Sequence, residues 1–160
     1  MIGKGKEMAE RLVIYDSVFG NTAKIARSIG ESIEAPVKKV SEVNEADLAG
    51  LKVLFVGSPT RAFNPTPAVT SLLKSLKRDS LTQVKAAAFD TRIELEDIKS
   101  SFFRSIIKSL GYADKKIAKW LTRKGANLAL ESKGFAVKDS EGPLKEGALE
   151  RAKTWAKAIL

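Results

Sequence analysis

The sequence predicts an α/β fold in which a five-stranded parallel sheet is covered by helices on both faces. Short runs of β-branched and aromatic residues alternate with longer segments whose apolar residues recur at helical spacing. Several of the strand runs are continuously apolar, as is typical of parallel strands buried on both sides. Strands that alternate with helices in this way indicate a three-layer, doubly wound sheet.

The composition is that of one globular domain. The 160 residues are 44% hydrophobic and 29% charged, and they contain no repeat or linker. We expect residues 1–10 to be an N-terminal lead-in and residues 11–160 to form the domain. The lead-in has no apolar segment typical of a secretory signal, and no apolar run approaches the length of a membrane span. The sequence therefore predicts a cytoplasmic protein with no membrane span.

The chain contains no cysteine and no histidine. This excludes disulfides, thiolate nucleophiles, Cys/His zinc sites and histidine acid–base catalysis. Glu94, Glu96 and Asp97 are the one local cluster of carboxylates, and we interpret them as a solvated turn and not as a metal site. We assign no metal ligand and no catalytic residue. Any redox chemistry therefore requires an organic cofactor.

The first predicted strand, Leu12–Tyr15, leads into a polar loop, Ser17–Thr22, which opens a helix expected over Thr22–Ile33. The loop carries hydroxyl and amide side chains and no acidic one. A polar, glycine-containing turn at a helix N-terminus suits an anion, because backbone N–H groups and the helix dipole are both directed at it. The alternative is an ordinary strand–turn–helix corner in which Thr22 is the N-cap.

The next elements continue the alternation. Residues 35–40 are predicted to form a short edge strand, because the segment contains a proline and two lysines. A helical turn is expected at 45–48. The continuous apolar run Val53–Gly57 indicates a central strand, and it ends in a proline-rich loop over 58–67. The last threonine–proline pair of that loop suits the start of a helix that runs to about Leu76.

The fourth strand is expected over Val84–Phe89, followed by a third loop, Asp90–Arg92. Residues 101–124 are predicted to form two helices broken at a glycine, with Phe102 and Phe103 on a buried apolar face.

Two short apolar segments, 126–130 and 135–137, predict either one last strand or a split pair. The closing helix is expected over Leu144–Leu160, with Leu149 facing inward. In a doubly wound sheet the ligand lies beyond the carboxyl ends of the strands, so the loops that follow strands one, three and four are expected to share one site.

The spacing in the first loop narrows the kind of site. The pattern Val-Ile-Tyr-x-Ser-x-x-Gly-x-Thr-x-x-x-Ala-x-x-Ile, from Val13 to Ile29, resembles the flavodoxin signature at every specified position. The resemblance covers essentially the whole chain, although its specificity is concentrated in this loop. It implies the flavodoxin-like strand order 2-1-3-4-5 and FMN as cofactor.

The resemblance assigns the cofactor contacts to the three loops. The first loop would hold the FMN phosphate, the second would lie along one side of the isoalloxazine ring, and the third would take the place of the remaining flavin loop. The residues are Ser17, Val18, Phe19, Gly20, Asn21 and Thr22; Ser58, Pro59, Thr60, Arg61, Ala62 and Phe63; and Asp90, Thr91 and Arg92.

Two features depart from the familiar flavodoxin pattern. Phe19 stands where flavodoxins usually have a threonine, and an aromatic residue there resembles the quinone-reductase branch. Phe63 is the one aromatic residue of the second loop that could stack on the ring. Arg61 or Arg92 near the ring would stabilise an anionic reduced flavin and favour hydride chemistry. The alternative is that both are solvated loop arginines.

The formal charge of +9 also differs from that of the acidic electron-carrier flavodoxins. Residues 99–124 hold eight basic residues and one acidic residue, Asp114. This excess indicates either a solvated helix face or docking to an acidic redox partner or to NAD(P)H. Nucleic acid is disfavoured, because the aromatic residues of the segment, Phe102, Phe103 and Trp120, are expected on apolar faces.

Three functions follow from these observations. The first is a low-molecular-weight, FMN-binding electron carrier, which is favoured by the lack of a dinucleotide fingerprint. The second is an FMN-dependent NAD(P)H:quinone-type reductase, which is favoured by Phe19 and the loop arginines. The third is a binding module that keeps the fold and has lost the flavin.

Overall fold

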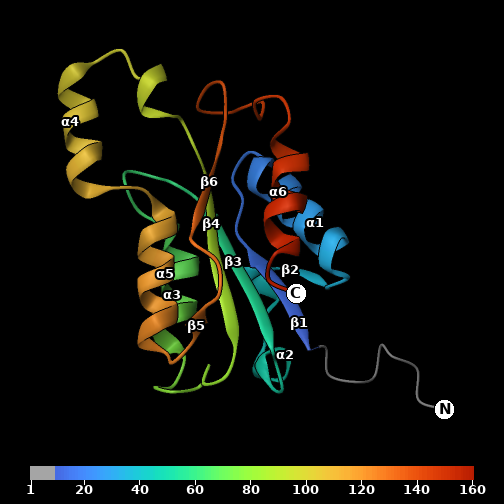
Figure 1. Cartoon of the computed structure of the whole chain (residues 1–160). Coiled ribbons are helices and arrows are strands. Elements are labelled where there is room, and N and C mark those ends of the chain that lie inside the picture. The colour runs from blue at the N-terminus through green and yellow to red at the C-terminus, as the bar shows by residue number, and fades with distance from the viewer. Residues whose placement is uncertain (1–9) are drawn as a thin grey trace.

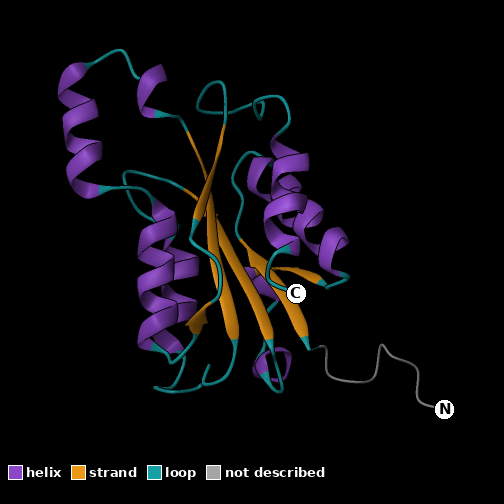
Figure 2. Ribbon diagram, viewed as in Figure 1, coloured by secondary structure: helices purple, strands orange, loops and turns teal. Residues whose placement is uncertain are grey.

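The computed structural model describes residues 10–160, so the expected lead-in over residues 1–10 lies, except for Glu10, outside the described residues. A central sheet separates two layers of helices (Figures 1 and 2). α3 and α5 cover one face, and α1 and α6 cover the other. The strand order is β2-β1-β3-β4-β5, with β6 also paired to β4, and all the pairings between these strands are parallel. The predicted fold class and strand order are confirmed.

The strands are close to those predicted from the apolar runs. They are β1 (Arg11–Tyr15), β2 (Val37–Lys39), β3 (Val53–Pro59), β4 (Lys85–Arg92), β5 (Asn127–Leu128) and β6 (Lys133–Ala136). β2 lies at an edge, as expected from its proline and lysines. β3 pairs with β1 on one side and β4 on the other, which explains why its apolar run is continuous.

The helices lie where the helical spacing predicts them, with differences at some ends. They are α1 (Asn21–Ile33), α2 (Glu45–Leu48), α3 (Pro67–Ser75), α4 (Ser101–Leu110), α5 (Ala113–Arg123) and α6 (Ala148–Lys157). Two short 3-10 turns lie between a strand and a helix: η2 (Val40–Glu42) between β2 and α2, and η3 (Leu95–Asp97) between β4 and α4.

The last strand is a split pair, which was one of the two alternatives. β5 pairs with Lys85 and Ala86 at the start of β4, and β6 pairs with residues 89–92 at its end. The chain leaves the sheet between the two segments. β4 therefore gains a partner over its polar end, which extends it through Arg92.

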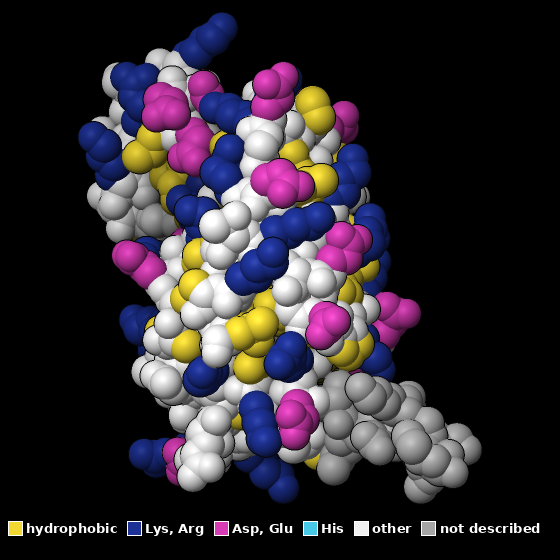
Figure 3. Space-filling view, turned by 45° about the vertical axis from the view of Figure 1, so that its right-hand side comes forward, with side chains coloured by type: hydrophobic (Ala, Val, Ile, Leu, Met, Phe, Trp, Pro, Cys, Tyr) yellow, Lys and Arg dark blue, Asp and Glu magenta, His cyan; other side chains and the backbone are white. Residues whose placement is uncertain are grey.

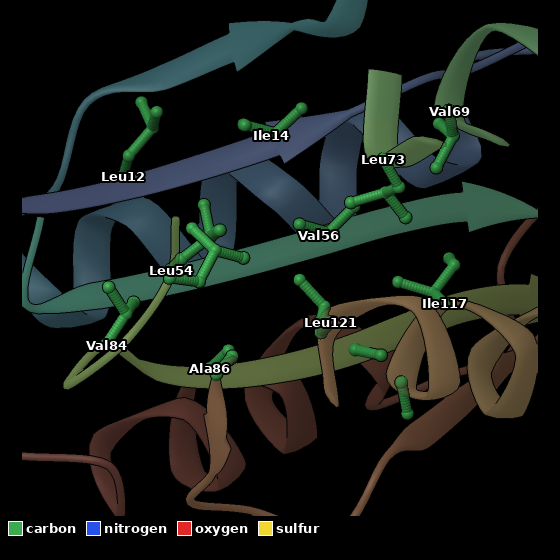
Figure 4. Packing of buried hydrophobic residues seen from close by; sticks show 14 of the residues in the cluster. Leu12, Ile14, Leu54, Val56, Val69, Leu73, Val84, Ala86, Ile117 and Leu121 are labelled. Carbon is green, nitrogen blue, oxygen red and sulfur yellow. The ribbon is translucent and has the colours of Figure 1, made fainter. Parts of the chain in front are cut away.

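Two apolar layers hold the sheet between the helices. Figure 4 shows the layer under α3 and α5, where Leu54 and Val56 of β3 meet Leu73 and Ile117. In the opposite layer the ring of Trp155 packs edge-on against three phenylalanines, the nearest being Phe55 at 5.3 Å between ring centroids. Both faces are thus filled, and ligand access is left to the ends of the strands.

The closing helix is shorter than expected. Residues predicted to begin it are held differently: Leu144 forms an isolated antiparallel bridge with Val137. The helix starts after Gly147. This residue has a left-handed φ of 79°, which favours glycine over residues with a side chain. The prediction that Leu149 faces inward is wrong, because it is 39% exposed.

The helix α4 stands away from the body of the domain (Figure 1). None of its residues is buried, since α5 already occupies the neighbouring sheet face. Phe102 and Phe103 are 69% and 54% exposed, so the prediction that they are buried is wrong. These exposed phenylalanines therefore give no reason to disfavour nucleic acid.

Several basic side chains of residues 99–124 interact with nearby groups of the domain. The ammonium of Lys124 donates to the carbonyls of Lys74 and Leu76, and Arg123 lies 4.8 Å over the ring of Trp120. Basic and acidic side chains are interspersed over the face drawn in Figure 3. Within residues 10–160 no helix has the length and apolar character needed to cross a membrane.

Candidate functional site

A cavity of about 570 Å³ opens at the carboxyl ends of β1, β3 and β4, where the sequence places the site. This volume lies within the range of small-molecule sites. Its lining residues come from the three predicted loops and from one further segment. They are Ser17, Val18, Phe19, Asn21, Thr22, Pro59, Thr60, Arg61, Ala62, Thr91, Arg92, Ile93, Val137 and Ser140.

The first loop is built around the hydroxyl of Ser17. Its Oγ accepts hydrogen bonds from the N–H of Gly20 at 3.0 Å and of Ala23 at 3.4 Å. Gly20 precedes α1 with a left-handed φ of 95°, which favours glycine at this position. The helix therefore begins at Asn21, and the alternative in which Thr22 is the N-cap is wrong.

The same loop leaves several donors free. Within residues 10–160, the backbone N–H groups of Val18, Phe19, Asn21 and Thr22 have no hydrogen-bond partner. All four belong to residues that line the cavity. The first turn of α1 has no acidic residue to oppose an anion. Unpaired N–H groups at the N-terminus of a 13-residue helix form a site for a phosphate or similar anion.

Two polar side chains of α1 connect this loop to other parts of the site. The hydroxyls of Thr22 and Thr91 lie 2.8 Å apart and are both buried, so one donates to the other. The side-chain amide of Asn21 donates to the carbonyl of Glu141 at 3.1 Å. This bond fixes the segment after β6 over the cavity, where Ser140 lines it.

Ile93, Val137 and Ser140 line the cavity but were not among the predicted site residues. A signal for two of them was present in the sequence. Val137 ends the predicted strand segment 135–137 and Ser140 follows it, and the rule that placed the other loops at the carboxyl edge applies equally to this strand end.

The second loop is tightly turned. Backbone hydrogen bonds in both directions join Arg61 and Asn64, and the two residues between them, Ala62 and Phe63, have left-handed φ values of 47° and 71°. Such strain in residues other than glycine is concentrated at functional sites. Phe63 does not line the main cavity. It lines a smaller one of about 180 Å³ beside α4, together with Ile93, Ile107 and Tyr112.

Three further predicted contact residues, besides Phe63, do not reach the main cavity. Ser58 is fully buried in β3, where its Oγ donates to the carbonyl of Pro59 and accepts from the N–H of Thr66. Gly20 provides the left-handed turn before α1 but does not line the cavity. Asp90 lies inside β4 and is also fully buried. The expectation of a third loop at Asp90–Arg92 is thus wrong, because pairing with β3 and β6 continues β4 over these residues.

The buried carboxylate of Asp90 is paired with Arg92. Nε and Nη2 of Arg92 lie 2.7 and 2.8 Å from the two oxygens of Asp90, and Nη2 is also 2.9 Å from Asp114. Arg92 therefore shares one positive charge between two carboxylates and is not a solvated loop arginine. Arg61 has no carboxylate partner within residues 10–160, and its guanidinium lies 5.5 Å from the centre of the Phe19 ring.

The electrostatics of this pair follow from burial. Burial raises the pKa of Asp90 to about 6, against the lowering effect of Arg92. Burial would lower the pKa of Arg92, but its hydrogen bonds to Asp90 and its attraction to both carboxylates raise it instead. Above about pH 6 the Asp90 carboxylate therefore faces a guanidinium that stays charged.

Residues 10–160 also form a second large cavity, and they contain no cluster of metal-ligating side chains. A cavity of about 490 Å³ lies between α2 and α3, at the opposite edge of the sheet, away from the strand-end loops. No group of three or more acidic side chains in residues 10–160 is arranged to hold a metal ion.

The fold and the site together define a doubly wound α/β protein with a ligand cavity at the carboxyl edge of its sheet. Comparisons with solved structures identify the fold as that of flavodoxins. Flavodoxin 2 from Bacillus cereus superposes with a TM-score of 0.73 at 20% identity, over 94% of this chain and 97% of that one. A WrbA-like flavodoxin from Agrobacterium tumefaciens gives 0.64 at 13% identity, over 94% of each chain.

The same fold occurs within larger proteins. The rubredoxin oxygen:oxidoreductase of Desulfovibrio gigas superposes with a TM-score of 0.67 at 21% identity, over 97% of this chain and 36% of that one. No protein-family model and no curated protein sequence matches the chain.

Proposed function

We propose that this chain binds FMN and serves as a low-molecular-weight electron carrier. The observation that carries the proposal is the set of four unpaired N–H groups in the first loop, at the N-terminus of α1 and open to the cavity. A doubly charged phosphate monoester would satisfy these donors without a lysine. The fold also supports the proposal of FMN binding and electron transfer, since flavodoxins are FMN-binding electron carriers.

The remaining lining residues suit the flavin ring. Five lining residues of β3, the loop after it and β4 are here called the ring wall: Pro59, Thr60, Arg61, Ala62 and Arg92. They combine the apolar side chains of Pro59 and Ala62 with polar groups that can bond the edge of a planar heteroaromatic ring. FMN, when bound, would supply the electron-transfer chemistry that the side chains lack. The residues that would hold the phosphate are Ser17, Val18, Phe19, Gly20, Asn21 and Thr22.

The state of the arginines favours a carrier over a hydride-transferring reductase. Arg92 has its charge compensated by Asp90 and Asp114, so it adds little net positive charge for an anionic reduced flavin. Arg61 is the one cavity arginine whose charge is uncompensated in the described part of the chain. The case for two-electron chemistry therefore rests on one exposed side chain instead of two.

The partner is proposed to be an acidic redox protein in the cytoplasm. The formal charge of +9 favours attraction to negative surfaces. Val18 and Phe19, which are about half exposed, provide apolar contact area at the mouth of the cavity. Residues 11–160 are proposed to form the flavin-binding domain. NAD(P)H is the alternative electron donor.

Titration of the apoprotein with FMN and with riboflavin tests the proposal. FMN should bind far more tightly, because riboflavin lacks the phosphate that the first loop is proposed to hold. Equal affinity for the two ligands would contradict the role of that loop, and no binding of either would leave the binding module as the better account. Oxidation of NAD(P)H by the loaded protein and a quinone would instead indicate a reductase.

A further inference from the structure

The guanidinium of Arg92 is enclosed on four sides. Asp90 and Asp114 bind its edge, at 2.7 to 2.9 Å. The ring of Tyr112 covers one face, with its centroid 3.8 Å from Cζ. On β6, a Cβ at Gly134 would lie 2.1 Å from Cζ, so a glycine is needed there to leave room. This arrangement fixes a side chain that lines both the main cavity and the smaller one.

Asp90 joins this enclosure to the second loop and to α5. Its Oδ2 accepts hydrogen bonds from the hydroxyl of Thr60 at 3.2 Å and from the N–H of Asp114 at 3.0 Å. The Thr60 hydroxyl in turn accepts from the N–H of Ala113 at 2.9 Å. One fully buried carboxylate therefore holds Arg92 of β4, Thr60 of the second loop and the first turn of α5.

We propose that Asp90 is a positioning residue for the ring wall and acts on the flavin ring through Thr60 and Arg92. This inference rests on the proposed function. Asp90 itself does not line the cavity, whereas Thr60 and Arg92 do. Its ionised carboxylate accepts the bonds that hold both residues in place, so its protonation removes an acceptor and loosens this part of the cavity.

The charges around Asp90 define how it would titrate. Arg92 of β4 and Asp114 of α5 are the charged groups that act on it directly, and Glu94 acts on Arg92. The adjacent strands place the uncharged residues Ser58 and Gly134 opposite it. Because burial raises its pKa to about 6, Asp90 changes its charge within a range where flavin binding can be measured.

Riboflavin is the probe that separates the ring wall from the phosphate loop, because it carries the ring alone. Asp90→Asn should weaken riboflavin and FMN by the same factor, about tenfold for a lost charged hydrogen bond. The ratio of the two affinities should stay that of the wild type. In the wild type, riboflavin affinity should fall as the pH drops through about 6, and in Asp90→Asn this step should be absent. Asp79→Asn, an exposed position at the far end of the sheet, is the matched control.

Two further variants keep the test valid if Asp90→Asn fails to fold. Thr60→Val keeps the shape and loses the hydroxyl, so it should weaken riboflavin, whereas Thr60→Ser should restore binding. Gly134→Ala should displace Arg92 and weaken riboflavin without altering either carboxylate. Unchanged riboflavin affinity in Asp90→Asn and Thr60→Val would overturn the proposal, as would a wild-type pH step that persists without Asp90.

The apoprotein provides a readout that does not depend on any flavin. The backbone N–H of Asp114 donates to Asp90, so its proton chemical shift should change as the pH passes through about 6 in the wild type. In Asp90→Asn this change should be absent. If the amide titrates but no flavin binds, the proposed function fails and the ring-wall role with it. If flavin binds but the amide does not titrate, only the inference about Asp90 is overturned.

Discussion

Replacing Ser17 with alanine should weaken FMN and spare riboflavin. The hydroxyl of Ser17 accepts from the N–H groups of Gly20 and Ala23, so its loss leaves two donors unpaired and the turn before α1 unsupported. Each hydrogen bond lost contributes about 1 kcal/mol net. A loss of about 1 to 2 kcal/mol corresponds to a weakening of FMN by about five- to thirtyfold.

Fluorescence or calorimetric titration of the apoprotein measures both affinities directly. Riboflavin should change by less than about twofold, because it lacks the phosphate that the first loop is proposed to hold. Ser32→Ala removes a hydroxyl from the same helix, where it bonds the carbonyl of Ile29, and serves as the control. An equal loss of affinity for the two ligands in Ser17→Ala would refute the assignment of the first loop to the phosphate.

Three other predictions concern charge and packing. Because the pKa of Asp90 is raised from 3.8 to about 6 in the folded protein, its contribution to stability is largest below pH 4 and is lost as the pH rises through about 6. The free energy of unfolding, measured at a series of pH values, should fall by about 3 kcal/mol over this range in the wild type, and Asp90→Asn should lack this fall. An identical pH dependence in the two proteins would contradict the raised pKa of Asp90. Arg61→Ala should lower the potential of bound flavin in a redox titration, because it removes the uncompensated positive charge beside the cavity. Phe55→Ala, in the core, should cost about 3 to 5 kcal/mol in denaturant unfolding, and Phe102→Ala, on the exposed face of α4, less than about 0.5.

The fold could be predicted from the sequence because its strands and helices have distinct periods. The continuous run Val53–Gly57 indicates a strand buried on both faces, and that strand is the centre of the sheet. The first loop could also be predicted from the sequence, because the spacing over Val13–Ile29 joins strand, turn and helix in one pattern.

The rest of the site depends on contacts between segments far apart in the chain. Asp90 and Arg92 look like a polar loop after an apolar run, but pairing with β3 at Asp90 and with β6 at both residues makes them part of a strand. The position of Arg92 further depends on the space left by Gly134. The amphipathic pattern of α4 predicts an apolar face, but the pattern alone does not say whether another element covers it, and none of the described residues buries Phe102.

The environment of the FMN phosphate tests the central claim most directly. A free phosphate monoester changes its charge with a pKa of about 6. If the N–H groups of residues 18–22 and the dipole of α1 hold it, the dianion should be favoured, and the ³¹P resonance of bound FMN should stay constant between pH 5 and 8. A bound ³¹P resonance that titrates as it does in free FMN would show that the phosphate remains in solvent, and it would contradict the account.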